Sequence, residues 1–555
     1  MCNFTDFIKP GVAASAALQD ALAAAIQGDH VLQFPPGEYH FYPEGCSQKY
    51  CWFSNNDEGI KTIAMLLDSV DDFTISGKDA LLIFHGRISP LAAFNCRNLK
   101  VEGLRVDFAD SFVSDADLVR RENGIAWFRL PGQHKVVNGK IVFTEDFYDN
   151  LHGKLFFFSY DCNKKELIRH PGMIVVENRD ILSRDGLVGV PDQFADVRTD
   201  AFLIKHEMRL CPGMVFDHCT NVQLSGVTLH HAAGMGFLLQ ASDTCTVENC
   251  VVVPRGRRAS VSDDALHITD CRGRIRIADC DLSGTLDDSI NVHGVFRNLK
   301  FYMPDGGMYY LETGHHQQMG VFNIQPGDHL ELRHRKTGVP YGILNVTQAH
   351  QVNRSYSVLE FAENTLPPEF TEGDPAWILE TQAELQVENT RCFPLNGRGI
   401  LASGLRDIHI SGCTFHTYGA GVFIPGDFNY WYESGPVAHA VIENNFFDNC
   451  CNSPGGVTRE PLTVFPELRE LENGFYYHGS ITVRNNRFRA DKRCLISMLS
   501  VAEATVEGNT FEYDSAYPFF HRGKTGYFFT DNNSPMAAFK HCGKVTVGNN
   551  PGFEC

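Results

Sequence analysis

Two short segments of the chain carry paired aspartates and superpose without a gap. In SDDALHI (262–268) and LDDSINVHG (286–294), Asp263 aligns with Asp287 and Asp264 with Asp288, each at a shift of 24 residues. An alternating apolar stretch follows each pair, which is typical of a strand. If the segments lie on neighbouring coils of a parallel β-structure, the acids stack about 5 Å apart. Carboxylates at that spacing can supply the acid and the base of a hydrolytic reaction.

A third segment, GRGILAS (397–403), extends the same alignment. If Ile400 follows Ile290 on the next coil, Asp264, Asp288 and Arg398 form one column. Two stacked carboxylates do not both ionise easily, so one pKa rises, whereas a neighbouring guanidinium keeps its partner ionised. The hypothesis is that Asp264 is a protonated general acid, and that Asp288, with Asp287 beside it, is the base. The predicted catalytic residues are therefore Asp264, Asp287 and Asp288.

Two other interpretations of these aspartates remain open at this point. Aspartate commonly bonds backbone amides in turns, so the pairs could be purely structural. Stacked carboxylates could also bind calcium. No paired Cys or His spacing indicates a zinc site, and we expect neither a metal nor a cofactor.

A cluster of aromatic and polar residues in GAGVFIPGDFNYWYESGPV (419–437) is a candidate sugar-binding segment. Aromatic faces pack on sugar C–H surfaces, and carboxylates and amides bond hydroxyl groups. A packed aromatic turn is the structural alternative, and the histidines at strand ends could also be structural. The predicted substrate-binding residues are Asp263, His231, Asn291, His293, Arg398, Asn429, Trp431 and Glu433.

A strand pattern recurs along most of the chain and would position these residues. An aliphatic residue marks each copy: Ile75, Val101, Leu224, Val247, Ile277, Val387, Ile410, Ile442, Val483, Val506 and Val547. Several of the intervals are 23 to 32 residues, the length of one coil, and no helical pattern intervenes. This predicts an all-β chain that forms a right-handed parallel β-helix. Asn445, Asn486, Asn509 and Asn550 share one position, which predicts either an internal ladder of asparagine amides or turn-forming residues.

Two intervals are too long for a coil: 123 residues from Val101 to Leu224, and 110 from Ile277 to Val387. Both contain short strands and turns, including VNGK (137–140), and predict two small inserted antiparallel β-barrels. An Ala-rich amphipathic helix at 13–27 would cap the open end of the solenoid. The expected domains are β-helix coils at 1–110, a barrel at 111–212, coils with the aspartates at 213–297, a barrel at 298–383, and coils at 384–555.

The composition of the chain limits the kinds of molecule that it can bind. The chain has 555 residues, of which 43% are apolar, and its formal net charge is −19. So acidic a surface repels nucleic acid, anionic membranes and polyanionic sugars, and favours a neutral substrate. The first residues show no export signal, so the expected location is cytoplasmic unless the sequence is trimmed from a secreted form. The 18 cysteines are expected to be free core thiols. A homodimer built through the insertions is compatible with the sequence.

The segments GTLDDSINVHG (284–294), SDDALHI, NGRGILAS (396–403), FNYWYESGPV (428–437) and FPPGEYHFYPE (34–44) together resemble glycoside hydrolase family 110. This family comprises α-1,3-galactosidases that remove terminal galactose from blood-group-B-type and linear α-galactosides. The resemblance covers nearly the whole chain. It implies exo-acting, inverting, metal-independent hydrolysis, and it assigns the catalytic roles to Asp264, Asp287 and Asp288. Which of them is acid and which is base stays open.

Three alternatives come from other classes. A polygalacturonase-like hydrolase shares the β-helix, but its Gly-His-Gly element is absent, because Val292 precedes His293. A polysaccharide lyase or epimerase would use a Lys, Arg or Tyr base facing a uronate. A non-catalytic glycan-binding solenoid would keep its activity after substitution of the aspartates.

Overall fold

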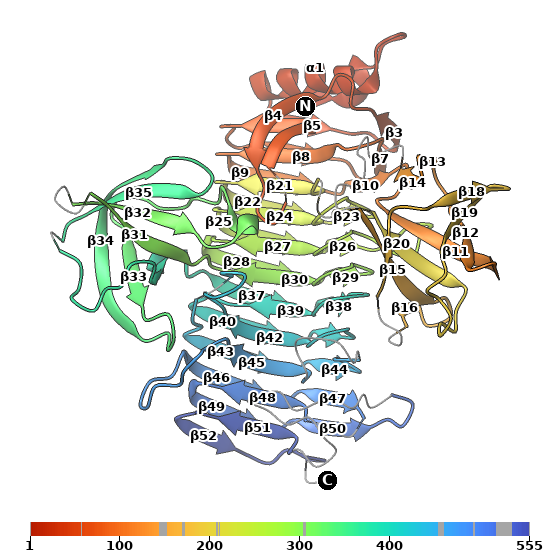
Figure 1. The fold of residues 1–555 in the computed structure, drawn as a ribbon. Coiled ribbons are helices and arrows are strands. Elements are labelled where there is room, and N and C mark those ends of the chain that lie inside the picture. The colour runs from red at the N-terminus through yellow and green to blue at the C-terminus, as the bar shows by residue number, and fades with distance from the viewer. Residues whose placement is uncertain are drawn as a thin grey trace.

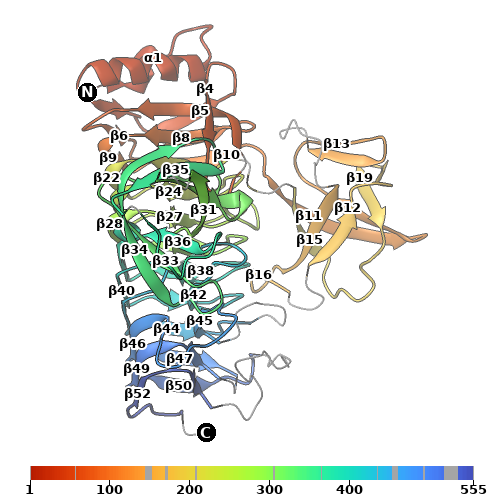
Figure 2. The same cartoon turned by 60° about the vertical axis from the view of Figure 1, so that its left-hand side comes forward.

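The computed structural model describes residues 2–56, 58–143, 153–168, 173–206, 209, 211–303, 307–363, 365–433, 435–452, 460–491, 494–517 and 535–553. Its main body is the right-handed parallel β-helix that the sequence predicts, with three sheets of 13, 11 and 12 strands. The coils stack from the N-terminal helix to the C-terminus, and the two insertions project from opposite sides (Figure 1). Turned by 60°, the first insertion stands clear of the coils (Figure 2).

The 13-stranded sheet contains the marker residues of the sequence repeat. Its strands are β1 (Cys2–Asn3), β2 (Val31–Gln33), β6 (Thr74–Ser76), β9 (Arg97–Glu102), β22 (Thr220–Ser225), β25 (Asp243–Glu248), β28 (Arg272–Ala278), β37 (Glu384–Glu388), β40 (Asp407–Ser411), β43 (His439–Glu443), β46 (His478–Arg484), β49 (Val501–Glu507) and β52 (Lys544–Val547). Val101 pairs with Leu224, and Ile277 with Val387. The predicted register is therefore confirmed across both insertions.

The other two sheets complete each coil. The 11-stranded sheet consists of β3 (Gly37–Phe41), β7 (Ala80–Phe84), β10 (Arg105–Phe108), β23 (Thr228–Leu229), β26 (Val251–Val252), β29 (Asp281–Ser283), β38 (Arg391–Phe393), β41 (Thr414–Phe415), β44 (Phe446–Asp448), β47 (Arg487–Ala490) and β50 (Thr510–Tyr513). The 12-stranded sheet consists of β4 (Ser47–Trp52), β5 (Glu58–Asp68), β8 (Ser89–Phe94), β21 (Met214–Asp217), β24 (Phe237–Gln240), β27 (Leu266–Thr269), β30 (Ile290–His293), β39 (Ile400–Ala402), β42 (Val422–Gly426), β45 (Leu462–Pro466), β48 (Ile496–Leu499) and β51 (Ala537–Lys540).

A ladder of asparagines runs through the C-terminal coils, as predicted. The Nδ2 of each side chain donates to the Oδ1 of the next, from Asn445 to Asn486, Asn509 and Asn550, at 2.9–3.0 Å. All four side chains are buried, so the ladder pairs polar groups that would otherwise be unsatisfied in the core. Most of the 17 described cysteines are buried.

One α-helix, α1 (Ala14–Gln27), lies across the N-terminal end of the β-helix (Figure 1). Its buried face is made largely of alanines and leucines, including Leu18 and Leu22, and packs on the main core. The helix thus covers the edge of the first coil, as expected. Within the described residues, no helix has the length and the apolar character needed to cross a membrane.

The second insertion, between β30 and β37, closes into an antiparallel barrel. It contains β31 (Arg297–Met303), β32 (Met308–Thr313), β33 (His329–Arg333), β34 (Pro340–Gln351), β35 (Tyr356–Phe361) and β36 (Pro375–Ile378). Alternating apolar residues of these strands form its own core. The entry to the barrel and its exit lie on adjacent coils, so the β-helix continues across the insertion.

The first insertion, between β10 and β21, is a second antiparallel unit. It contains β11 (Val113–Glu122), β12 (Ile125–Arg129), β15 (Lys154–Asp161), β16 (Glu166–Leu167), β17 (Ile174–Glu177), β18 (Leu182–Arg184), β19 (Leu187–Pro191) and β20 (Ala201–Lys205). Its described strands follow an open path from β16 to β18. The hairpin β13 (His134–Val137) and β14 (Lys140–Phe143) covers the core with Ile141 and Phe143. Its turn is VNGK, as expected, with positive φ at Asn138 and Gly139.

Candidate active site

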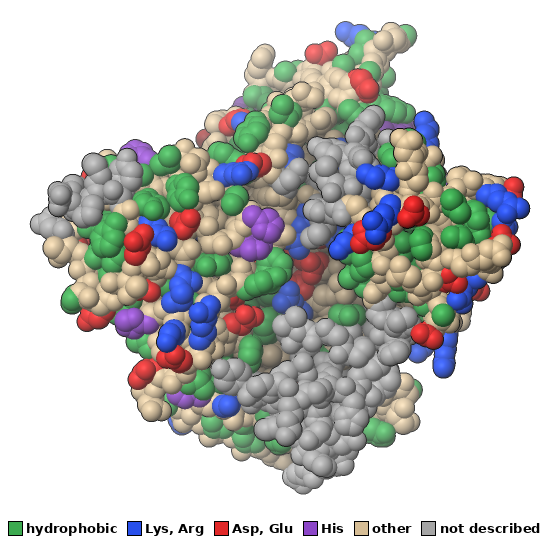
Figure 3. All heavy atoms as spheres, in the orientation of Figure 1, with side chains coloured by type: hydrophobic (Ala, Val, Ile, Leu, Met, Phe, Trp, Pro, Cys, Tyr) green, Lys and Arg blue, Asp and Glu red, His purple; other side chains and the backbone are tan. Residues whose placement is uncertain are grey.

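A cavity of about 320 Å³ lies over the 12-stranded sheet. Figure 3 shows acidic and basic side chains in a depression between the two insertions. Its polar lining includes Arg209, Asp264, Asp287, Asn291, Arg398 and Glu433, and its aromatic lining is Tyr418, Phe423 and Trp431. The cavity therefore combines acids, cations and apolar ring faces, the usual components of a site for a polar ligand with an apolar surface.

Three adjacent strands position the acidic column. Leu266 of β27 pairs with Ile290 of β30, which pairs with Ile400 of β39. The predicted register is therefore confirmed. Asp264 Oδ1 accepts the backbone N–H of Asp288 at 3.0 Å, and Asp288 Oδ1 accepts the backbone N–H of Arg398 at 2.6 Å. Each acid is thus held by the coil that follows it.

Gly397 explains why the third coil can approach the aspartates so closely. Its φ is +95°, and a Cβ atom there would lie 2.5 Å from the backbone carbon of Asp287. Any larger residue would push this coil away from the aspartates. Glycine at this position in the NGRG sequence is therefore a packing requirement of the site.

Asp264 is a buried acid at the floor of the cavity. Its Oδ2 lies 2.7 Å from Nδ1 of His267, which is also buried. Burial raises the pKa of Asp264 well above its usual range, and the neighbouring carboxylate of Asp287 acts in the same direction. The side chain is thus suited to hold a proton at neutral pH and to give it to a ligand in the cavity.

Asp287 lies beside Asp264 in a different environment. It is partly exposed to the cavity, with 29% of its side chain accessible, and its Oδ2 accepts from Nη2 of Arg209 at 3.1 Å. The hydroxyl of Thr285 donates to its backbone carbonyl at 2.7 Å and fixes the turn. An accessible carboxylate in this position can accept a proton from a water molecule in the cavity.

Asp288 faces away from the cavity and is fully buried. Nε and Nη2 of Arg398 contact its two carboxylate oxygens, each at 2.9 Å. Burial raises the pKa of Asp288, and the Arg398 guanidinium acts in the opposite direction. Oδ1 accepts hydrogen bonds from the backbone N–H and from Nε of Arg398, whereas Oδ2 lies 2.9 Å from Nη2 and has no hydrogen bond among the described residues. We therefore assign to Asp288 the role of orienting Arg398. The structure thus gives the two members of the Asp287–Asp288 pair different environments.

One oxygen atom from each of Asp264, Asp287 and Asp288 lies within 4.8 Å of the others, a spacing at which a cation could be bound. Each carboxylate already has another partner: His267 for Asp264, Arg209 for Asp287 and Arg398 for Asp288. Two of these partners are cations that repel a metal ion. The donor set therefore fits acid–base chemistry better than the calcium site considered from the sequence.

Glu433 forms another acidic group of the cavity. Its Oε1 accepts from Nδ2 of Asn55 at 3.3 Å and from Nε2 of Gln318 at 3.4 Å, and lies 3.9 Å from Nε2 of His293. Burial would raise the pKa of Glu433, but His293, His267 and Arg398 outweigh it and hold the pKa below its usual range. Glu433 is thus an ionised acceptor for ligand hydroxyl groups.

The structure divides the predicted substrate-binding residues into two groups. Asn291, Arg398, Trp431 and Glu433 line the cavity. His293 is buried behind the lining, where it contacts His267.

The other predicted residues support the surrounding structure. Asp263 is buried, with Oδ1 2.7 Å from Nζ of Lys205 and 3.1 Å from Nε of Arg209. His231 accepts the N–H of Phe112 at 2.9 Å. Asn429 donates through Nδ2 to the carbonyl of Glu467 at 3.3 Å. None of these three side chains is part of the described lining of the cavity.

Several lining residues were not identified from the sequence. Arg209 follows the last strand of the first insertion, and Gln317 lies in η4 (His316–Gln318) of the second. Asn55 and Glu467 come from turns of distant coils. None of them occupies a repeat position, so periodicity gave no signal for them. His267 lies within the SDDALHI motif and directly follows Leu266. Its position three residues after Asp264 was the one feature of the sequence that could have indicated their contact.

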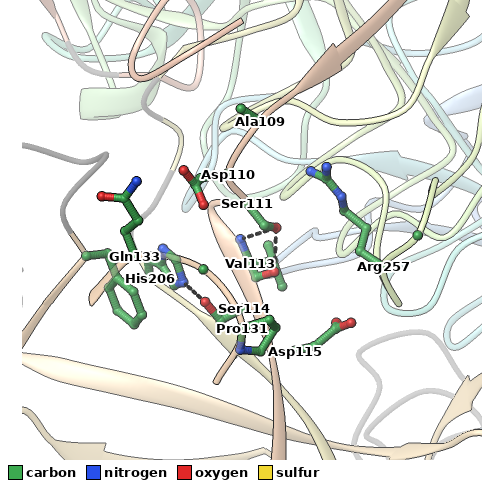
Figure 4. A pocket seen from close by; sticks show the side chains of 13 residues that line it. Ala109, Asp110, Ser111, Val113, Ser114, Asp115, Pro131, Gln133, His206 and Arg257 are labelled. Carbon is green, nitrogen blue, oxygen red and sulfur yellow. Dashed lines mark hydrogen bonds between the residues drawn. The ribbon is translucent and has the colours of Figure 1, made fainter. Parts of the chain in front are cut away.

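A second, smaller cavity of about 160 Å³ lies where the first insertion meets the β-helix (Figure 4). His206 Nε2 lies 2.6 Å from the hydroxyl of Ser114, and Asp110 and Asp115 are also in the lining. Asp115 accepts the backbone N–H of Arg258 at 3.2 Å. The guanidinium of Arg257 donates to the backbone carbonyl of Phe108 at 2.8 Å. These contacts connect the insertion to the coils.

Fold and site together define a parallel β-helix with an acidic cavity over one of its sheets. Residues 310–375 match the family model described as GLAA-B beta-barrel domain II. Over 509 residues the chain is 25% identical to "Alpha-1,3-galactosidase A" of Bacteroides fragilis (strain YCH46), covering 88% of this chain and 83% of that protein. It is also 25% identical to "Alpha-1,3-galactosidase B" of Akkermansia muciniphila, covering 92% and 67%. The resemblance to the α-1,3-galactosidases is thereby confirmed.

Among solved structures, the family 28 exopolygalacturonase of Yersinia enterocolitica is similar at a TM-score of 0.40 and 12% identity. The similarity covers 98% of this chain and 78% of that chain.

Proposed function

We propose that the protein is an exo-acting glycoside hydrolase that removes terminal α-1,3-linked galactose from neutral glycans. The observation that carries the proposal is the contrast between two neighbouring acids in one cavity. Burial favours a proton on Asp264, whereas Asp287 is open to the cavity and accepts a hydrogen bond from the Arg209 guanidinium at 3.1 Å. A pair of carboxyl groups in opposite protonation states is what glycoside hydrolysis requires. The names of the relatives support galactose as the sugar that is released.

In the proposed reaction, Asp264 gives its proton to the glycosidic oxygen as the C–O bond breaks. Asp287 accepts a proton from the water molecule that attacks the anomeric carbon. In each turnover, Asp264 therefore loses one proton and Asp287 gains one. Arg398, Asn291 and Glu433 bind sugar hydroxyl groups, and the exposed ring of Trp431 offers an apolar face to the sugar. Because Asp264 must be protonated to act as an acid, activity falls as the pH rises through its pKa.

The proposed stereochemical outcome is inversion, as the resemblance implies. One oxygen atom of Asp264 and one of Asp287 lie within 4.8 Å, close to the separation of about 5 Å found in retaining enzymes and below the roughly 6.5–9.5 Å of many inverting ones. The anomer of the first product therefore distinguishes two roles of Asp287. Initial β-galactose supports a base that activates water, and initial α-galactose shows a nucleophile that forms a covalent intermediate.

The test is the release of galactose from Galα1-3Gal by the wild type and by the Asp264→Asn and Asp287→Asn variants. Each substitution is expected to lower kcat by about 100- to 10,000-fold, because it removes a proton donor or acceptor. The product anomer is followed by proton NMR during the first turnovers. Asp281→Asn is the matched control, since Asp281 is a partly exposed carboxylate on β29 that is paired with Arg391 outside the cavity.

Other outcomes would support the other classes of function. Unchanged rates in both variants would remove Asp264 and Asp287 from the mechanism. An unsaturated product, formed in a chelator-sensitive reaction, would indicate a lyase. Glycan binding without any release of galactose, retained in both variants, would indicate a binding module.

A further inference from the structure

We infer that Asp263 is a positioning residue for the proposed base: it holds Arg209 of the first insertion against Asp287 and thereby fixes the orientation of that carboxylate. The sequence repeat aligns Asp263 with Asp287, but of the two Asp287 alone belongs to the described lining of the cavity. The inference deepens the proposed function and rests on it, because it gives the first aspartate of the SDDALHI motif a role in the same reaction.

One guanidinium group joins the two aligned aspartates. Asp263 and Asp287 precede the paired strands β27 and β30 by the same number of residues, so they occupy equivalent positions of neighbouring coils. Nε of Arg209 donates to Oδ1 of Asp263 at 3.1 Å, and Nη2 donates to Oδ2 of Asp287 at 3.1 Å. Because a guanidinium group is planar and rigid, the contact with Asp263 fixes the plane from which Nη2 reaches Asp287.

The other contacts of Arg209 are with neutral groups. Nη1 donates to Oε1 of Gln317 at 3.2 Å and lies 3.5 Å from the backbone carbonyl oxygen of Asn55. Among the described residues, Asp263 and Asp287 are thus the ionic partners of this side chain. A long side chain loses conformational freedom when it is held in one geometry. Without Asp263, the guanidinium would keep one anionic partner and could adopt other orientations.

Asp263 is suited to hold a cation and not to meet a ligand. Its side chain is 1% exposed, its Oδ1 also accepts from Nζ of Lys205 at 2.7 Å, and its Oδ2 accepts from the hydroxyl group of Ser262 at 2.8 Å. Burial alone would raise the pKa of Asp263, but Lys205 and Arg209 outweigh burial and hold the pKa below its usual value. A carboxylate enclosed in this way acts on the reaction through the groups that it binds.

The contact with Arg209 leaves one oxygen atom of Asp287 for the reaction. Arg209 occupies Oδ2, whereas Oδ1 has no hydrogen-bond partner among the described residues. A water molecule in the cavity can therefore donate to Oδ1 while Arg209 keeps the carboxylate from turning. General-base catalysis depends on such geometry, and a displacement of about 1 Å can cost about 100-fold in rate.

The second aspartate pair has the same division of roles as the first. In each pair, one acid lines the cavity and the other holds an arginine of the lining. The lining acids are Asp264 and Asp287, and the holding acids are Asp263, which contacts Arg209, and Asp288, which contacts Arg398. The repeat in the sequence is therefore also a repeat of this arrangement.

A purely structural role of Asp263 would act through Lys205 instead. Lys205 is the last residue of β20, and its Nζ contacts Oδ1 of Asp263 and the backbone carbonyl of Ser262. Among the described residues, Nζ makes no contact with Asp287. Lys205→Met is therefore the matched control, because it removes an ion pair with Asp263 but leaves Arg209 between the two aspartates.

Rate measurements separate the two roles. Asp263→Asn keeps the shape of the side chain and removes its charge, and kcat for Galα1-3Gal should fall by about 10- to 100-fold because Arg209 is no longer held. KM should change less than kcat, since Asp263 does not touch the substrate. Lys205→Met should change kcat by less than about twofold. In an Arg209→Ala background, Asp263→Asn should also change kcat by less than about twofold, because residues that act through one another are not additive.

A double variant covers the case in which Asp263→Asn alone does not fold. Asp263→Asn combined with Lys205→Met removes the carboxylate together with one of the two cations that it neutralises, so that fewer unpaired charges stay buried. This variant should lose about as much of kcat as is expected for Asp263→Asn, that is, about 10- to 100-fold.

Crystal structures of the variants test the inference without substrate. Nη2 of Arg209 should leave Oδ2 of Asp287 in Asp263→Asn and in the double variant, and should stay within hydrogen-bonding distance of it in Lys205→Met. A wild type that releases no galactose would contradict the proposed function and would leave this comparison intact.

Four results would overturn the inference. Arg209 could remain on Asp287 in the variants that lack the Asp263 carboxylate, or kcat could be unchanged in them. Lys205→Met could lower kcat as much as Asp263→Asn does. The effects of Asp263→Asn and Arg209→Ala on kcat could also be additive, which would show that Asp263 does not act through Arg209.

Discussion

Adjacent residues of one motif occupy opposite environments in this protein. Asp287 and Asp288 follow each other in the chain, but Asp287 lies in the cavity against Arg209, whereas Asp288 is buried against Arg398. In the proposed mechanism, Asp287 therefore carries the chemistry and Asp288 orients Arg398.

This division predicts different effects of the two substitutions on stability. Asp288→Asn leaves the guanidinium of Arg398 without its charged partner and should lower the free energy of unfolding by about 3 kcal/mol, the effect of breaking a buried pair. Asp287→Asn alters a partly exposed carboxylate and should lower it by less than about 1 kcal/mol. Chemical denaturation followed by fluorescence measures both values. Equal losses of stability would show that the two acids have the same structural role.

At the scale of single elements, the C-terminal coils depend on the asparagine ladder. Oδ1 of Asn486 accepts both the backbone N–H and the Nδ2 of Asn445 at 3.0 Å, and its own Nδ2 donates to Asn509 at 3.0 Å. Neighbouring rungs therefore share their hydrogen bonds, and the loss of one side chain leaves groups on both sides unsatisfied.

Substitution of a central rung should therefore weaken the coils measurably. Asn486→Ala is expected to lower the free energy of unfolding by roughly 2 kcal/mol, because buried donors and acceptors lose their partner. Faster hydrogen exchange should be confined to β46, β47 and their neighbours. Asn163→Ala, at an exposed turn of the first insertion, is the control and should change neither quantity. An unchanged exchange pattern in Asn486→Ala would mean that the ladder contributes no stability.

The elements that the sequence predicts are those that repeat. The coils repeat an aliphatic marker residue at one position, so Ile277 could be aligned with Val387 across a barrel of unrelated sequence. The column of Asp264, Asp288 and Arg398 follows from the same alignment. The alignment does not give the direction of a side chain before the strand begins. For that reason, the exposure of Asp287 and the burial of Asp288 could not be read from the sequence.

At the scale of the whole molecule, the cavity is completed by residues far apart in the chain. Arg209 comes from the end of the first insertion and Gln317 from the second, whereas the acids come from the coils between them. These residues are not related by the sequence repeat. They lie close together only because each insertion packs against the β-helix in a particular orientation. The sequence therefore predicts the floor of the cavity but not its walls. Figure 3 shows the two insertions on either side of the cavity.

The net charge of −19 leads to a prediction about substrate charge. The field of an acidic protein repels an anionic ligand but has little effect on a neutral one. For neutral Galα1-3Gal, kcat/KM should change by less than about twofold between about 0.01 M and 1 M salt, over which the screening length falls from roughly 30 Å to 3 Å. For the same disaccharide with its reducing-end residue oxidised to a uronic acid, kcat/KM should be lower at low salt and rise with salt, because screening removes the repulsion. Initial rates across a salt series measure both, and the neutral disaccharide controls for direct effects of salt on the enzyme. A preference for the anionic disaccharide at low salt would show that Arg209 and Arg398 outweigh the net charge within the cavity, and would make an acidic glycan the better substrate.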